Sequence, residues 1–311
     1  MTSVRIDEAP SPGTDDWRKL ISASKVSAIL GISPWTSQYR LWHEMAGNLE
    51  PDDPSDSMKK IFDWGHSAEL AIRDWWLRQN PTHTLSDGEV AYMDDSVEFP
   101  HLVTLDLEGH SAEFEEEDGD GRYIVECKTV NSIDSLNKWG RPSEEDAIPA
   151  PYLVQLLFQM RISGIHRAFV VMQCMGAPSV YVVKWDEEMA DAIVERCAEF
   201  WKSVDSGVEP PLDDSKATLD AVRGIHANIE KGTEYSISSG EAMSLLWAKE
   251  AEDDATKRLN LLKSNILVRM LKAQRLVCNG NIVATRVAGR GTQVNLRFNN
   301  KAKEAIFNGT V

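Results

Sequence analysis

The chain has 311 residues, more than one typical domain needs, so its length favours a large α/β domain or a domain with an appendage. With 42% hydrophobic and 26% charged residues, it falls among globular proteins, which excludes general disorder. No apolar run approaches the roughly 18 residues of a membrane span. Asp7 and Glu8 stand where a secretory signal needs basic and apolar residues, so we expect a cytoplasmic protein.

The net charge of −16 hides a strong asymmetry. Residues 255–311 carry 11 Lys and Arg side chains and one acidic side chain, Glu304, whereas the preceding 254 residues carry 22 basic and 48 acidic side chains. The sequence leaves two roles open for this basic tail. It contacts DNA phosphates, or it pairs with acidic groups of the body or of a neighbouring subunit.

The four cysteines match neither a zinc nor an iron–sulfur spacing, so we expect reduced and mostly buried thiols. The acidic run Glu113–Asp120 is interpreted as a solvated hairpin tip, and a calcium loop is the alternative. Hydrophobic periodicity, turn residues and helix-start signals predict the other elements of the first region. In chain order these are a helix over Lys59–Gln79, strands at Glu89–Met93, His101–Leu107 and Arg122–Thr129, a helix from Pro151 to about Ile162, strands at Arg167–Cys174 and Ser179–Trp185, and a helix from Glu187 to about Ser206.

The strands predicted at His101–Leu107 and Arg122–Thr129 are expected to form a hairpin. The Pro- and Asp-rich stretch Gly207–Lys216 predicts a boundary between a core, residues 1–212, and an appendage, residues 218–311. In the appendage, Ser238 and Glu241 form a capping-box pattern that begins a helix running to about Ala273. Three short strands follow, at Arg275–Cys278, Asn281–Val287 and Gln293–Phe298. We therefore expect an α/β core with a central mixed sheet flanked by helices, and a basic helical and β appendage.

Charged residues in two predicted strands point to chemistry. Asp106 lies between Leu105 and Leu107, and Glu126 and Lys128 alternate with Val125 and Cys127, so Glu126 and Lys128 share one face of their strand. Two carboxylates in apolar strands repel each other unless they share a cation. Mg²⁺ fits, with the carbonyl of Cys127 as a further ligand. Lys128 can then orient or help deprotonate an attacking water, or stabilise charge that develops on a phosphate.

An acidic residue followed about twenty residues later by Glu-x-Lys resembles the PD-(D/E)xK nuclease superfamily. Further motifs in the same order resemble its lambda-exonuclease/YqaJ-type viral recombinase family, from about residue 20 to 215. These motifs are Ile21-Ser22-Ala23-Ser24-Lys25, Leu30 to Trp35, Trp64-Gly65-His66-Ser67-Ala68-Glu69, Thr104-Leu105-Asp106, Glu126-Cys127-Lys128-Thr129, Gln155 with Gln159, and Phe200-Trp201 with Pro210-Pro211.

The resemblance implies a role for each matching residue. Glu69 is the outer acidic ligand, Asp106 and Glu126 are the central metal ligands, and Lys128 is the catalytic lysine. The pair Gln155 and Gln159 corresponds to the family's helix motif, although Gln159 stands where a tyrosine is usual.

The resemblance also implies contacts with the DNA end. Ser24 and Lys25 hold the terminal 5′-phosphate, at a position where many members have Ser-Arg. A lysine there keeps the charge but lacks the planar fork of arginine. Trp35, in a predicted loop, is a candidate for contact with a DNA end.

The activity implied by the family is a Mg²⁺-dependent exonuclease, with two metal ions and with Mn²⁺ as a substitute. It digests one strand of a linear duplex from 5′ to 3′ and leaves a 3′ single strand for an annealing protein. A ring-shaped trimer in the cytoplasm of a bacterial or phage-infected cell is expected. Two alternatives remain open: an endonuclease of the same superfamily, and a non-catalytic acidic protein that mimics the charge of DNA.

Overall fold

The structure is a computed structural model, and it describes residues 3–144, 146–289, 291, 293–299 and 302–308. The chain divides into two compact units, Met1–Ile229 and Glu230–Val311. In the part of the chain that the structure describes, no helix is long and apolar enough to cross a membrane. All four cysteines are free thiols, and Cys127 and Cys197 are buried.

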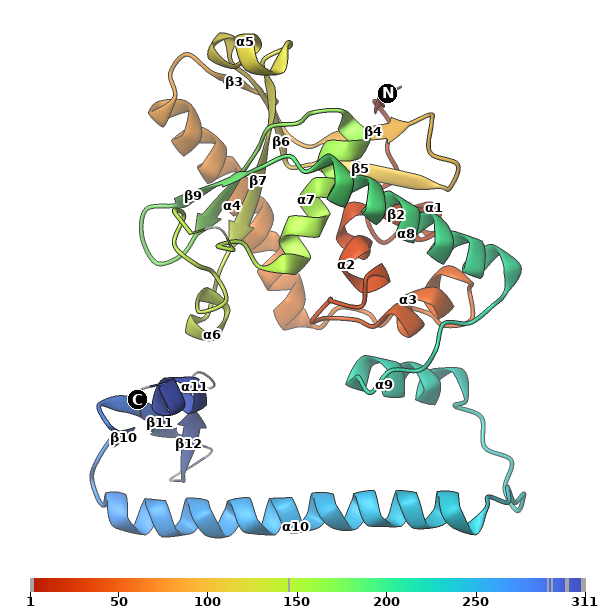
Figure 1. The fold of residues 1–311 in the computed structure, drawn as a ribbon, viewed down its shortest axis with the longest axis vertical. Coiled ribbons are helices and arrows are strands. Elements are labelled where there is room, and N and C mark those ends of the chain that lie inside the picture. The colour runs from red at the N-terminus through yellow and green to blue at the C-terminus, as the bar shows by residue number, and fades with distance from the viewer. Residues whose placement is uncertain (1–2, 145, 290, 292, 300–301, 309–311) are drawn as a thin grey trace. The chain divides into compact units, whose positions relative to one another are not determined.

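The first unit has the mixed α/β fold flanked by helices that the sequence predicts, but its strands form two mixed sheets and not one central sheet (Figure 1). One sheet has the strand order β1-β4-β5-β2, and the other has the order β3-β6-β7-β8-β9. The pairs β2–β5 and β7–β8 are parallel, and the other pairs in these sheets are antiparallel. The elements in chain order are β1 (Ser3–Ile6), α1 (Asp15–Arg18), β2 (Ile21–Ser22), η1 (Ala23–Lys25), α2 (Val26–Ile29), α3 (Gln38–Met45), α4 (Asp56–Gln79), β3 (Thr84–Leu85), β4 (Val90–Asp94), β5 (His101–Leu105), β6 (Leu107–His110), η2 (Ala112–Phe114), α5 (Glu115–Asp118), β7 (Arg122–Thr129), α6 (Ile133–Leu136), α7 (Ala150–Ser163), β8 (Ala168–Gln173), β9 (Ser179–Val183), α8 (Glu187–Ser206) and α9 (Lys216–Ile225).

Helix α4 packs on one face of strand β7. The side chain of Ser55 caps its first turn, and its apolar stripe buries Ile72 and Trp76 against Tyr123 and neighbouring residues of the sheet. Gly109 on β6 permits this packing, because a Cβ atom there would lie 2.2 Å from the Tyr123 ring. The alternation of β7 thus directs its odd-numbered residues toward α4 and leaves its even-numbered residues for the opposite face.

Helix α7 lies on that opposite face, where its side chains reach Glu126 of β7. Pro151 lies at the second position of the helix, in the first turn, where a backbone N–H group would have no partner within the helix. Gly164 ends it in the left-handed conformation, at φ 69°, which a residue without Cβ adopts at little cost. The two faces of β7 are therefore covered by two helices that are far apart in the sequence.

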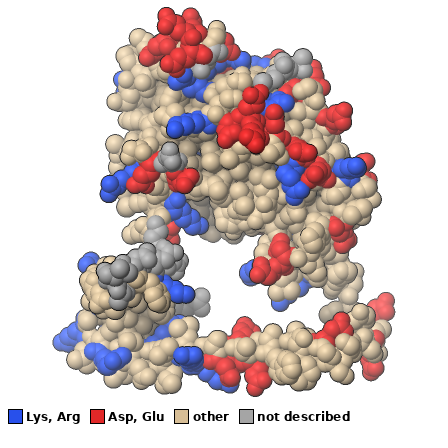
Figure 2. All heavy atoms as spheres, viewed as in Figure 1, with Lys and Arg blue, Asp and Glu red and all other residues tan. Residues whose placement is uncertain are grey.

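The predicted strand His101–Leu107 is two strands in different sheets. It ends as β5 at Leu105, bends at Asp106, and resumes as β6, which pairs with β7 in the register Leu107 to Val125. The hairpin is therefore formed by β6 and β7, and β5 belongs to the other sheet. Apolar residues on both sides of Asp106 hide this break in the sequence. The acidic run that joins β6 to β7 forms η2 and α5 and gives a cluster of acidic side chains at the top of Figure 2.

The division between the units follows α9. The predicted boundary at residues 212–218 lies before this helix, but α9 packs against α3 and belongs to the first unit. Its contact is close, since a Cβ atom on Gly224 would lie 2.8 Å from Cδ1 of Leu49. The Pro- and Asp-rich stretch is therefore a connection within the first unit.

The second unit contains a long helix followed by a small antiparallel sheet. Helix α10 (Ser239–Met270) begins with the predicted capping box, in which Ser238 and Glu241 each bond the backbone of the other. The sheet has the order β10-β11-β12, and a short helix follows. These elements are β10 (Arg275–Cys278), β11 (Asn281–Ala288), β12 (Val294–Phe298) and α11 (Ala302–Asn308). Two cations of the basic tail, Arg290 and Lys301, lie outside the described residues.

Candidate active site

Glu126 is the buried centre of the site, with only 1% of its surface exposed. Its Oε1 atom accepts hydrogen bonds from Nζ of Lys128 at 2.6 Å and from Nε2 of Gln155 at 2.5 Å. Its Oε2 atom accepts from Nε2 of Gln159 at 3.0 Å. A buried carboxylate is tolerated when it is paired and hydrogen-bonded, and these three donors meet that requirement. The predicted placement of Glu126 and Lys128 on one face of β7 is thus seen directly in their ion pair.

Lys128 remains charged in this environment. Burial lowers its pKa, but the charges of Glu126 and Asp106 outweigh burial and raise the pKa above the ordinary lysine value. The Nζ atom also lies 5.2 Å from the centroid of the Tyr152 ring, where the ring face favours a cation. Because its pKa is raised, Lys128 stays protonated at neutral pH and contributes a positive charge to this site.

Asp106 occupies the bend between the two sheets. Its Oδ2 atom accepts a hydrogen bond from the backbone N–H of Cys127 at 2.7 Å, which fixes the carboxyl beside β7 just past the last pair of the β6–β7 ladder. Burial, followed by the negative charge of Glu126, raises the pKa of Asp106 well above its ordinary value. The positive charge of Lys128 therefore does not offset the repulsion and burial that act on the carboxyls of Asp106 and Glu126.

Glu69 approaches the same carboxyls from α4 without contacting them. It lies three residues before Ile72 on α4, which packs on the face of β7 that carries Tyr123 and not on the face that carries Glu126. Burial raises the pKa of Glu69, and among the charges that act on it those of Glu89 and Glu126 raise it further. The charge of Glu69 in turn contributes to the raised pKa of Asp106.

A cluster of aromatic rings adjoins Lys128, and its central member was not predicted from the sequence. The ring of Tyr152 stacks on Trp139 at 5.4 Å and lies 5.8 Å from the ring of Trp35, between centroids. Trp35 is 63% exposed, so it offers an open aromatic face at the margin of this cluster. Tyr152 precedes Gln155 by three residues and Gln159 by seven, so helical spacing could have placed it on the same face of α7.

The chain is similar to a protein family and to several known proteins. Residues 15–166 match the family model of the YqaJ-like viral recombinase domain. This segment of the chain is similar to that family. The uncharacterized protein YqaJ of Bacillus subtilis (strain 168) is 22% identical over 272 residues, which cover 84% of this chain and 79% of that protein.

Two solved structures are also similar to this chain. LHK-Exo, in complex with dAMP, has 13% sequence identity and a TM-score of 0.44, over 63% of this chain and 94% of that one. SSO0001 has 11% identity and a TM-score of 0.36, over 62% of this chain and 77% of that one.

The chemistry of the site around Glu126 suits a hard divalent cation. Its carboxyls supply oxygen ligands that repel one another, and burial keeps the Cys127 thiol neutral by raising its pKa, which leaves the backbone carbonyl as that residue's oxygen donor. Among the described residues, however, no three carboxyl, imidazole or thiol side chains come together closely enough to form a metal site by themselves. A cation here needs a carbonyl and water as well, which is common for Mg²⁺.

The structure corrects the role expected of Lys25. Its Nζ atom donates to the carbonyl oxygens of Trp17, Arg18 and Leu20 at 3.2, 2.8 and 2.7 Å, so all three N–H groups are used at the end of α1. The side chain is 9% exposed, and burial lowers its pKa to about 8. Lys25 therefore joins η1 to the end of α1, and in this structure its charge is directed at backbone carbonyls and not at a phosphate site. Ser24 is exposed and its hydroxyl shares a hydrogen bond with that of Ser22.

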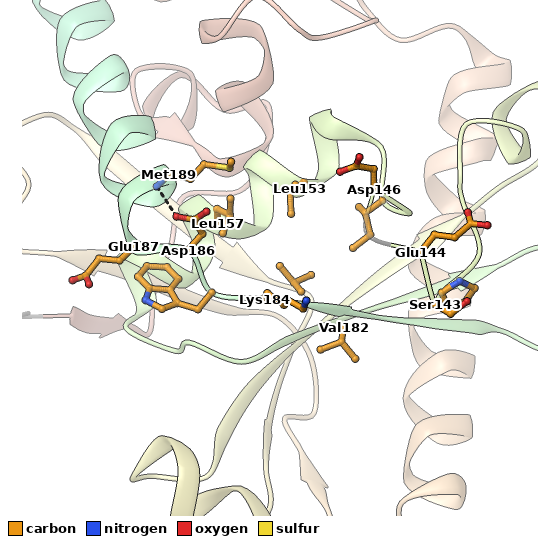
Figure 3. Close-up of a pocket in the computed structure, with 14 residues that line it drawn as sticks. Ser143, Glu144, Asp146, Leu153, Leu157, Val182, Lys184, Asp186, Glu187 and Met189 are labelled. Atoms are coloured by element: carbon orange, nitrogen blue, oxygen red, sulfur yellow. Dashed lines mark hydrogen bonds between the residues drawn. The ribbon is translucent and has the colours of Figure 1, made fainter.

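A cavity of about 760 Å³ lies away from these carboxyls (Figure 3). It is lined by Leu153 and Leu157 of α7 together with residues that follow β9, including Asp186 and Glu187. Helical spacing places Leu153 and Leu157 on a different side of α7 from Gln155 and Gln159. The cavity is thus separate from the site around Glu126.

Proposed function

We propose that this chain is a magnesium-dependent deoxyribonuclease that digests linear duplex DNA from its ends. The observation that carries the proposal is the junction of Asp106, Glu126 and Lys128, in which two repelling carboxyls and a permanently charged lysine meet beside β7. The match of residues 15–166 to a viral recombinase family supports a role in DNA recombination.

Each residue has a separate task in this proposal. The oxygens of Glu69, Asp106, Glu126 and the Cys127 carbonyl hold Mg²⁺, which when bound supplies Lewis-acid stabilisation of charge and makes a water nucleophilic at neutral pH. Gln155 and Gln159 fix the Glu126 carboxylate through their amide groups. Lys128 stabilises negative charge on the phosphate that is attacked, because its raised pKa makes it a poor base.

The DNA end is proposed to lie over the exposed ring of Trp35, which the aromatic cluster places near Lys128. Aromatic rings stack with bases of any sequence, which suits an enzyme that advances along a strand. Digestion from 5′ to 3′, an annealing protein as partner and a trimeric assembly are further proposals that rest on the resemblance of the motifs.

A comparison of linear and covalently closed circular duplexes tests this function. The linear substrates carry a label at the 5′ end or the 3′ end of one strand and are incubated with Mg²⁺ or with EDTA. We expect loss of the linear substrate only with Mg²⁺, early release of the 5′ label, and an intact circle. Cleavage of the circle would show an internally cutting enzyme, and no cleavage of either substrate would contradict nuclease activity.

A further inference from the structure

Helix α10 is exposed along nearly its whole length, although it carries many large apolar side chains. Of its 32 residues only Met270 is buried. Met243, Leu246, Trp247 and Leu261 are exposed by 41, 62, 61 and 63%. A helix in water gains most of its stability from packing of its apolar side chains, and contiguous exposed apolar surface marks an interaction site. Most of this helix therefore has no packing partner among the described residues of its own unit.

One side of α10 does face its own unit. Near its C-terminal end, Ile266 and Leu267 are half-buried and Met270 is buried, and Nζ of Lys263 lies 5.7 Å from the ring centroid of Phe298 on β12. With about 100° between successive residues, these positions share one side of the helix. The opposite side points away from the small sheet.

That opposite side has the spacing of a helix-pairing seam. Steps of four and three residues run from Met243 through Trp247 to Leu261 and Val268, and all of these side chains are exposed. Alternation of four and three is the repeat with which one helix packs against another over several turns. The apolar residues lie at the two ends of this seam, and charged residues lie at its centre.

The charges select the occupant and its direction. The first half of α10, residues 239–254, carries five acidic side chains and one lysine, and the second half, residues 255–270, carries four basic side chains and no acidic one. The same division is visible along the helix in Figure 2. On the seam, Glu250 and Asp254 precede Lys257, and Arg258 lies next to it. When a second copy of α10 packs antiparallel, the acidic half of each helix lies beside the basic half of the other. When it packs parallel, side chains of like charge lie beside each other.

We propose that two copies of this chain associate through α10, antiparallel and about a two-fold axis near the middle of the helix. In the register that overlaps residues 241–270 of the two helices, Asp254 faces Lys257 of the second copy, and Met243 faces Val268 of the second copy. The two-fold axis repeats each contact, so Asp254 of each copy lies beside Lys257 of the other. The seam also gives part of the basic tail a role in assembly. If the chain also forms the trimer proposed above, three such helix pairs join two trimers, and the assembled protein still contains an even number of copies.

Charge reversal in the full-length protein tests this pairing by sedimentation velocity across a concentration series. We expect wild type to form dimers or assemblies of paired copies. Asp254→Lys should weaken association by about tenfold or more, because attraction becomes repulsion at both symmetric positions. Adding Lys257→Asp to the same chain should restore it.

The matched control is Glu252→Lys, which breaks an intrahelical pair of the same kind. Glu252 pairs with Lys249 at 3.1 Å, as Asp254 pairs with Lys257 at 3.1 Å, but Glu252 lies on the other side of the helix. It should change association by less than about twofold. A monomeric wild type, an odd number of copies, equal effects of the two single variants, or tighter association of Asp254→Lys would each overturn the antiparallel pair.

Discussion

Gln159 and Glu126 are joined by a hydrogen bond of 3.0 Å from Nε2 to Oε2, and the same amide nitrogen donates to the carbonyl of Thr104 at 2.9 Å. Gln159 therefore links the carboxylate of β7 to the end of β5, next to Asp106. The side chain is 1% exposed, and water cannot readily replace it. The position at which the family resemblance implies a tyrosine is used here to hold the Glu126 carboxylate against the end of β5.

This relationship predicts a difference between two glutamines of the same helix. Gln159→Leu leaves two buried acceptors without their donor and should lower the free energy of unfolding by about 2–4 kcal/mol. Gln155→Leu removes one donor from a half-buried position where water can enter, and should cost about 1 kcal/mol. Urea denaturation of both variants measures this difference. Equal losses would contradict the linking role of Gln159.

A second prediction concerns Asp106 and the dependence of stability on pH. The raised pKa of Asp106 means that the folded protein binds this proton more tightly than the unfolded chain does, so its ionisation destabilises the fold as pH rises through the raised pKa. Without divalent cations, Asp106→Asn should therefore be more stable than wild type at pH 8, and the gain should shrink as the pH falls to 4.

Mg²⁺ should reverse this order. At a concentration one hundred times its dissociation constant, a bound ion stabilises the folded state by about 2.7 kcal/mol. We expect that gain in wild type and not in Asp106→Asn. Asp63→Asn, which changes an exposed carboxyl on α4, is the control. Thermal unfolding at several pH values, with EDTA or Mg²⁺, checks both statements, and a gain for Asp106→Asn that does not depend on pH would refute the first.

Lys25 should matter for stability and not for recognition of the 5′-phosphate. Lys25→Met keeps the apolar stem but leaves three carbonyl groups without their donor, so we expect a loss of about 2–4 kcal/mol. Lys19→Met, at a nearby exposed lysine, should have little effect. The ratio of digestion rates on 5′-phosphorylated and 5′-hydroxyl duplexes should stay as in wild type for any folded Lys25→Met protein. A selective loss of the preference for phosphate would restore the role that the sequence suggests.

Trp35 should affect the binding of DNA and leave the fold unchanged. Because its ring is exposed, Trp35→Ala should alter stability by less than about 0.5 kcal/mol. Loss of one stacking contact should weaken binding of a duplex with a single-stranded end by about 1–3 kcal/mol. Trp35→Phe retains an aromatic face and should recover most of that loss. Titration of labelled DNA in EDTA, where cleavage cannot occur, measures the affinities, and identical affinities of Trp35→Ala and wild type would exclude Trp35 from the binding surface.

The sequence predicted the parts of the site that depend on local periodicity. Strand alternation placed Glu126 and Lys128 on one face, and helical spacing placed Gln155 and Gln159 together, and the structure confirms both. The position of Asp106 was harder to predict. Its neighbours Leu105 and Leu107 continue the same apolar alternation, so the sequence does not show that the chain changes sheets between them.

Lys25 shows a different limit. A serine and a lysine at the head of a helix have the pattern of a phosphate site, and only tertiary structure shows that the end of α1 captures the ammonium group. The four-residue helix α1 is too short to give a periodic signal. The sequence also did not predict the exposed apolar side of α10. Charged and apolar residues alternate around this helix, and only the structure shows which side the small sheet covers.

The most direct test of the account is the rate of nucleotide release from an end-labelled linear duplex by wild type, Asp106→Asn and Lys128→Met, with Asp63→Asn as control. In Mg²⁺ we expect both site variants to lose at least about a hundredfold in rate while remaining folded, because each removes a charge that acts on the reacting phosphate or its metal. Asp63→Asn should match wild type, and EDTA should abolish release by all four proteins. Release at the wild-type rate by folded Asp106→Asn or Lys128→Met would contradict the assignment of the active site.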